Sequence, residues 1–138
     1  MKQRNLLIAL ALVTFGFAGH AHEGEDHDKP STIQAPKGGS IKSLEQTHVE
    51  VVVKGKDIKI YLYDKDLKPQ SVKNYTVSAN AKMPRTKKIE TVELKIQDQH
   101  FEATYDAKGM HRYTLILAVK DPKTVHDDKL NFTIEPKK

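Results

Sequence analysis

The sequence predicts an all-β protein. From Ser40 onward, apolar and polar residues alternate with a period of two over short stretches, and Gly, Pro, Asn and Asp residues lie between these stretches. No segment keeps the apolar spacing of an amphipathic helix. About seven such strands within residues 40–138 favour an antiparallel β-sandwich of immunoglobulin-like type. A small barrel is the lesser alternative.

The clearest expected element is a hairpin between residues 47–53 and 58–63. Gly55 and Lys56 form a two-residue loop with glycine first, which suits a type II′ turn. The resulting register gathers the apolar residues on one face, whereas a slip by one residue would scatter them. The expected pairs are Val49 with Leu62, Val51 with Ile60, Val53 with Ile58, His48 with Tyr63, and Glu50 with Tyr61.

A second hairpin is expected between residues 90–97 and 100–105, with its loop at Asp98-Gln99. Residues 75–81 and 129–134 alternate cleanly and predict two further strands. Residues 112–119 are apolar on both faces in their second half, which predicts a central strand. The second hairpin would pair Ile96 with Phe101, Leu94 with Ala103, Val92 with Tyr105, and Lys95 with Glu102.

Residues 1–21 are typical of a secretory signal peptide. Lys2 and Arg4 precede an apolar run over residues 6–18, and small residues suited to signal peptidase follow. Cleavage is expected after Ala21, with Ala18 as the alternative, and the run is shorter than the roughly 20 residues that span a bilayer. We therefore expect a signal peptide (1–21), a His-rich acidic tail with a Pro/Gly linker (22–39) and a β-sandwich domain (40–138). The processed protein would be soluble in the periplasm or secreted.

Composition excludes several classes of function. The 138 residues include 23 Lys and Arg against 18 Asp and Glu, a net charge of +5, and removal of residues 1–21 lowers it to +3. This mixed charge lacks the concentrated basic patch of a nucleic-acid-binding face. The absence of cysteine excludes disulfides and thiolate metal sites. No catalytic motif is present, so we expect a non-enzyme, although an active site assembled from distant strands would leave no motif.

The strongest chemical signal is the segment His22–Asp28, HEGEDHD, which holds two imidazoles and four carboxylates in seven residues. Imidazole and carboxylate together suit zinc, nickel, cobalt and divalent copper, and short His-rich tracts commonly bind metal. We expect His22 and His27 as ligands, with Asp26 assisting. If cleavage follows Ala21, the free amine of His22 would add a donor for Cu(II). The alternative is that the segment is simply a solvated polar tail.

Two residues of the domain could complete such a site. His48 and Glu50 share one face of the first predicted strand, opposite the face that carries Val49, Val51 and Val53. A half-exposed, hydrogen-bonded strand histidine is the alternative for His48. His100 occupies a similar face beside a predicted turn.

Residues 35–69 resemble a group of small exported bacterial proteins and the amino-terminal region of periplasmic adaptor subunits of heavy-metal efflux pumps. The shared features are the pair Gly38-Gly39, the His-x-Glu of His48 to Glu50, the Tyr-Leu-x-Asp of residues 61–64 and the Lys-Pro of residues 68–69. The resemblance implies a periplasmic β-domain associated with transition-metal handling, with His48 and Glu50 as candidate ligands. Those relatives often carry a histidine just before the Gly-Gly pair, where this chain has Lys37.

The leading hypothesis is therefore a soluble periplasmic protein that binds a divalent transition metal, with copper or zinc as the favoured cofactor. It would act as a buffer or delivery partner for an efflux or resistance system. The rival hypothesis is a metal-free interaction module that docks on an envelope protein through a sheet edge or loop.

Overall fold

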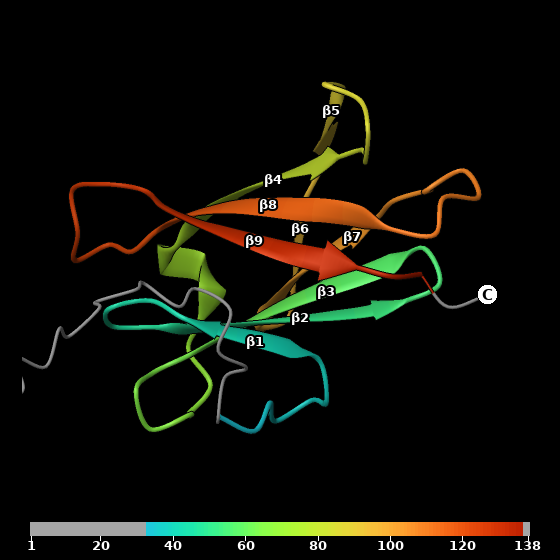
Figure 1. Cartoon of the computed structure of the whole chain (residues 1–138). Helices are drawn as coiled ribbons and strands as arrows, with labels where there is room; N and C mark the ends of the chain where they lie inside the picture. Colours follow the sequence, from blue (N-terminus) through green and yellow to red (C-terminus); the bar gives the residue numbers. More distant parts are fainter. Residues whose placement is uncertain (1–32, 137–138) are drawn as a thin grey trace, which may run out of the picture.

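The structure, a computed structural model, describes residues 33–136 as two antiparallel β-sheets packed face to face (Figure 1). A short 3₁₀ helix, η1 (Val72–Asn74), lies between the third and fourth strands. The strands of this part of the chain are β1 (Ser40–Ser43), β2 (His48–Lys54), β3 (Asp57–Tyr63), β4 (Thr76–Lys82), β5 (Ile89–Val92), β6 (Lys95–Gln97), β7 (His100–Thr104), β8 (Tyr113–Lys120) and β9 (Asp128–Ile134).

The strand order confirms the predicted immunoglobulin-like sandwich. One sheet has the order β1-β2-β3-β7-β6 and the other has the order β5-β4-β8-β9. Strands β2, β3, β7 and β6 correspond to A, B, E and D of the immunoglobulin fold, and β4, β8 and β9 correspond to C, F and G. The short strands β1 and β5 are edge additions to this seven-strand plan.

The first hairpin forms as predicted. All five expected pairs between β2 and β3 occur, and the ladder closes with Lys54 opposite Asp57, next to the Gly55-Lys56 loop. Gly55 has a φ of 59°, as the first position of such a turn requires. Val49, Val51, Ile58, Ile60 and Leu62 are therefore buried between the sheets. We call the opposite side of this sheet, directed away from the four-stranded sheet, its outer face.

The prediction for the second hairpin is confirmed for residues 95–97 and wrong for residues 90–94. Ile96 pairs with Phe101 and Lys95 lies opposite Glu102, as expected. Residues 89–92, however, form β5 and pair with β4 in the other sheet, so the expected pairs Leu94–Ala103 and Val92–Tyr105 do not form. The chain changes sheet at Glu93 and Leu94, as strands at the corners of sandwiches do.

The predicted central strand is confirmed as β8, which lies between β4 and β9. Its inward residues Leu115, Leu117 and Val119 are fully buried, while Ile116 and Ala118 on its other face are half-buried. The predicted strands at residues 75–81 and 129–134 correspond to β4 and β9.

A polar contact ties the two sheets at one end of the sandwich. The hydroxyl of Thr47, just before β2, donates to Oδ2 of Asp121 at 3.3 Å and lies 3.2 Å from the hydroxyl of Tyr75. Asp121 also accepts a hydrogen bond of 2.8 Å from the main-chain N–H of Lys123. Thr47 and Asp121 are buried, and these bonds give their polar atoms the hydrogen-bond partners that buried polar groups require.

Within residues 33–136, no helix has the length and hydropathy of a membrane span.

Because three tyrosines are buried, we expect the protein to lose stability at alkaline pH. Burial and a hydrogen bond to Glu90 raise the pKa of Tyr105 to about 12, and burial raises the pKa of Tyr113 to about 12. Burial, followed by the hydrogen bond to Glu50, also raises the pKa of Tyr63. A phenol whose pKa is higher in the folded state stabilises the fold fully below its unfolded pKa of about 10. That contribution is lost as the pH rises through the folded pKa.

We therefore expect these groups to leave the free energy of unfolding unchanged between about pH 7 and 9, and to lower it between about pH 10 and 12. Urea unfolding across this range, with the absorbance of tyrosinate recorded in parallel, measures both effects. Ionisation of these three phenols at pH 10 in the still-folded protein would contradict the assignment.

Candidate functional site

The predicted ligands divide between two parts of the chain. His22, Asp26 and His27 lie outside residues 33–136, which the structure describes, and their role stays a prediction. His48 and Glu50 lie on β2 and share the outer face of the five-stranded sheet, as the alternation predicted.

Glu50 is a fully buried carboxylate held entirely by hydrogen-bond donors. Its Oε1 accepts from the main-chain N–H of Lys37 at 3.0 Å and of Gly39 at 2.8 Å. Its Oε2 accepts from the hydroxyl of Tyr63 at 2.8 Å and again from the N–H of Lys37 at 3.2 Å. A carboxylate offers only acceptors, and these donors offset the cost of removing its oxygens from water. We call this arrangement the Glu50 anchor.

The Glu50 anchor fixes the chain that precedes β1. Residues 33–39 cross the outer face of the five-stranded sheet, away from the other sheet (Figure 1). Gly39 approaches β2 so closely that a Cβ atom there would lie 2.4 Å from the carbonyl oxygen of Val51. Gly38 completes a turn, with a φ of 74° and its N–H bonded to the carbonyl of Ala35 at 3.0 Å. The last part of the predicted linker is thus bound to the sheet.

Because of this anchor, both oxygens of Glu50 are already occupied. A metal ion at this carboxylate would have to replace the N–H groups of Lys37 and Gly39 or the hydroxyl of Tyr63. Glu50 as a ligand stays a prediction, and its observed contacts are those of a structural group.

His48 is also engaged through both ring nitrogens. Its Nε2 lies 3.3 Å from the carbonyl oxygen of Lys65, and its Nδ1 lies 2.8 Å from the hydroxyl of Ser43. Because a carbonyl oxygen only accepts, the network assigns the proton to Nε2 and makes Nδ1 the acceptor of the Ser43 hydroxyl. Metal binding at Nδ1 would require Ser43 to rotate away.

A second histidine with a carboxylate partner lies on the same outer face. Nε2 of His100, on β7, lies 2.9 Å from Oε1 of Glu102, and its ring stacks at 5.0 Å from the ring of Tyr61 on β3. This pair was missed by the sequence reasoning. The signal was present, because residues two apart on a predicted strand share a face.

Two lysines lie on this part of the outer face. Nζ of Lys37 lies 5.6 Å from the ring centroid of Tyr61, and Nζ of Lys59 lies 3.6 Å from Glu102. The hydrogen bond from His100 and the charge of Lys59 hold the pKa of Glu102 below its ordinary value, although partial burial opposes them. Glu102 therefore stays ionised at neutral pH.

Residues 33–136 contain no group of three or more His, Cys, Asp or Glu side chains arranged to hold a metal ion.

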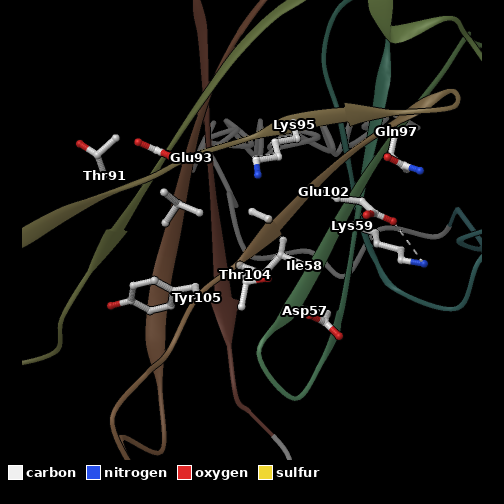
Figure 2. Close-up of a pocket in the computed structure, with 12 residues that line it drawn as sticks. Asp57, Ile58, Lys59, Thr91, Glu93, Lys95, Gln97, Glu102, Thr104 and Tyr105 are labelled. Carbon is white, nitrogen blue, oxygen red and sulfur yellow. Dashed lines mark ion pairs between the residues drawn. The ribbon is translucent and has the colours of Figure 1, made fainter.

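A cleft of about 640 Å³ lies beside the edge strands β5 and β6, where the chain passes from one sheet to the other. Figure 2 shows Thr91 and Glu93 on one side of it, Lys59 and Glu102 on the other, and Lys95 between them. The lining mixes both charges. Two exposed isoleucines, Ile89 and Ile96, belong to the flanking strands β5 and β6.

No family model matches the chain, and no curated protein matches its sequence. Among solved structures, the fold is similar to the crystal structure of as-isolated FetP from uropathogenic E. coli strain F11, which was recombinantly expressed in the periplasm of E. coli BL21(DE3). The match has a TM-score of 0.53 and covers 70% of this chain and 92% of the FetP chain, at 8% sequence identity. At this identity the likeness concerns the fold alone.

The Glu50 anchor predicts a large effect of a nearly isosteric substitution. In Glu50→Gln, one amide oxygen replaces two acceptors, and the new NH₂ group faces a donor. We expect the free energy of unfolding to fall by about 2–3 kcal/mol, because buried donors lose their partner. Urea unfolding measures this loss.

The exposed Glu45, in the β1–β2 connection, provides the control, and Glu45→Gln should change stability by less than about 0.5 kcal/mol. Equal stabilities of the two variants would show that the anchor contributes nothing.

Proposed function

We propose that this chain is an exported protein that binds a divalent transition metal, copper or zinc first among them, as a buffer or delivery partner for a metal efflux or resistance system. The observation that carries the proposal is the Glu50 anchor. It attaches residues 37–39, the end of the predicted linker, to the sheet face that also presents His48 and His100.

The donor chemistry supports this proposal. His22, His27 and Asp26 supply borderline nitrogen and hard oxygen donors, a combination that suits divalent copper and zinc. The other carboxylates of residues 22–28 raise the local concentration of cations. The outer face adds the imidazoles of His48 and His100, which are hydrogen-bonded to neighbouring groups.

The anchor also lowers the entropic cost of binding. Ordering a free segment around an ion costs about 1–2 kcal/mol for each residue fixed. Residues 37–39 are already bound to β2, so binding of an ion incurs no such cost for them. Nine residues lie between His27 and Lys37, and the ten Cα-to-Cα steps between them reach roughly 33 Å when extended.

Export to the periplasm is the expected setting of this function. It rests on the signal-peptide features of residues 1–21. FetP, which shares the fold, was produced in the periplasm of E. coli, and this is compatible with the same setting here.

Metal binding to the folded state predicts a rise in melting temperature. With Zn(II) or Cu(II) at a hundredfold excess over the dissociation constant, we expect about 2.7 kcal/mol of added stability. Replacing His22 and His27 together by alanine should remove most of this gain, measured by scanning calorimetry on protein with its natural amino terminus. The exposed His111 and His126 provide a matched double-alanine control that should keep the gain. A melting curve unchanged by excess metal would end the proposal.

The exposed isoleucines favour one second candidate, a metal-free module that docks on an envelope protein at the β5–β6 edge. If so, Ile89→Asp together with Ile96→Asp should abolish capture of a single envelope protein, and added chelator should have no effect. Val125, 96% exposed on the β8–β9 connection, gives the control Val125→Asp, which should leave capture intact. Capture that depends on metal, or that survives the double substitution, would exclude this candidate.

A further inference from the structure

We propose that a small pocket on the outer face binds the phosphate group of a phosphate monoester. The pocket has a volume of about 250 Å³, and we call it the lysine pocket. It is lined by Lys37, Val52, Lys54, Asp57, Lys59 and Tyr61, all within residues 33–136. The inference is independent of the metal-binding function proposed above, because the lining includes none of the residues assigned to a metal ion.

The hairpin of β2 and β3 forms the floor of the lysine pocket. Val52 lies opposite Lys59 in the ladder, and Lys54 lies opposite Asp57. Residues two apart on a strand share a face, so these four side chains and that of Tyr61 all project from the outer face. The pocket thus follows from the same alternation that buries the residues between them.

The chain before β1 forms one wall of the lysine pocket. The main-chain N–H of Lys37 is bonded to Glu50 at 3.0 Å, so the side chain of Lys37 starts from a fixed point. Its Nζ lies 5.6 Å from the ring centroid of Tyr61, which is itself packed at 5.0 Å against the ring of His100. A ligand therefore meets a wall and a floor that are in place before it binds, which lowers the cost of binding.

The charge of the lining selects the class of ligand. Three lysines against one aspartate give the lining a net charge of +2. A phosphate monoester carries about −1.5 to −2 at pH 7, so it balances this charge. A single carboxylate would balance only half of it. Lysine binds phosphate as a point charge, with three N–H donors to offer.

Two of the three ammonium groups have no carboxylate partner in the part of the chain that the structure describes. Lys59 lies 3.6 Å from Glu102, which does not line the lysine pocket (Figure 2). The ion pairs of residues 33–136 include neither Lys37 nor Lys54. A phosphate group can therefore pair with both of these lysines without breaking an existing ion pair.

Size limits the rest of the ligand. Pockets for drug-sized molecules occupy roughly 300–1,000 Å³, and the lysine pocket is smaller. Val52 and Tyr61 are half-buried and give the pocket an apolar side. We therefore expect a phosphate group carried on a small apolar or ring-shaped body, for which phenyl phosphate is a simple probe.

The first test is calorimetric titration of the full exported protein with phenyl phosphate. The protein is first freed of metal on a chelating resin, because phosphate also binds metal ions. We expect Lys37→Gln and Lys54→Gln each to weaken binding by about fivefold, the effect of losing one exposed ion pair. Asp57→Asn removes the opposing charge and should tighten binding by a similar factor.

The matched control is Lys42→Gln. Nζ of Lys42 lies 5.6 Å from the ring centroid of Phe132, the same arrangement as Lys37 over Tyr61, but neither Lys42 nor Phe132 lines the lysine pocket. This variant removes the same charge from the protein and should change affinity by less than about twofold, because salt screens distant charges. Phenyl sulfate is the control for the ligand, since it has a similar shape but a single charge, and it should bind more weakly.

A phosphate monoester occurs on soluble molecules and as the headgroup of phosphatidic acid, and a second measurement separates these sources. Vesicles of phosphatidic acid and phosphatidylcholine in equal parts, compared with phosphatidylcholine alone, test the lipid by sedimentation. Binding of phenyl phosphate that depends on Lys37 and Lys54 supports a soluble ligand. Sedimentation with the same dependence, without binding of phenyl phosphate, supports the lipid headgroup.

Three results would overturn the proposal. The wild-type protein binds neither phenyl phosphate nor the phosphatidic acid vesicles, or Lys42→Gln weakens binding as much as Lys37→Gln, or phenyl sulfate binds as tightly as phenyl phosphate. Because Lys37, Lys54 and Asp57 are exposed, their variants should keep the melting temperature of the wild type, so a change in affinity reports on the ligand contact. None of these results bears on the metal-binding function, because the titrations contain no metal.

Discussion

The structure depends on the burial of one carboxylate. Removing Glu50 from water is costly, and the cost is tolerable only where donors converge on both oxygens. Tyr63 supplies one donor from the next strand, and the main chain at Lys37 and Gly39 supplies the others. The chain before β1 must therefore fold onto the outer face. Gly39 permits this approach, because any larger residue would meet the carbonyl oxygen of Val51. A local polar requirement thus determines where residues 37–39 lie on the sheet.

Alternation was enough to predict the hairpin of β2 and β3, because its turn and its apolar face agree on a single register. The same reasoning failed at β5. The side chain of Val92 points into the space between the sheets and is buried there. It would be buried in the same way if residues 89–92 paired with β7 instead of β4, so the sequence pattern is the same for both pairings. Which edge a strand joins is decided by main-chain hydrogen bonds that leave no trace in the order of side chains. β1 was not singled out for a related reason, since only one of its residues is buried.

The candidate site, like the strand pairing, could be predicted from the sequence only in part. The shared face of His48 and Glu50 follows from their spacing, but the occupation of Glu50 does not, because two of its donors are main-chain N–H groups that any residue carries. The pairing of His100 with Glu102 was readable, since its two members are two residues apart on one strand. What the sequence lacked was the neighbourhood: the packing of Tyr61 on His100 becomes visible only when β7 is known to lie beside β3.

The side chain of Lys37 is independent of the anchor. Lys37 contacts Glu50 through its main-chain N–H, so the anchor places no demand on the side chain. That side chain carries its ammonium group over the ring of Tyr61, on the outer face. The charge of this face can therefore change without moving residues 37–39, because their position depends on main-chain donors.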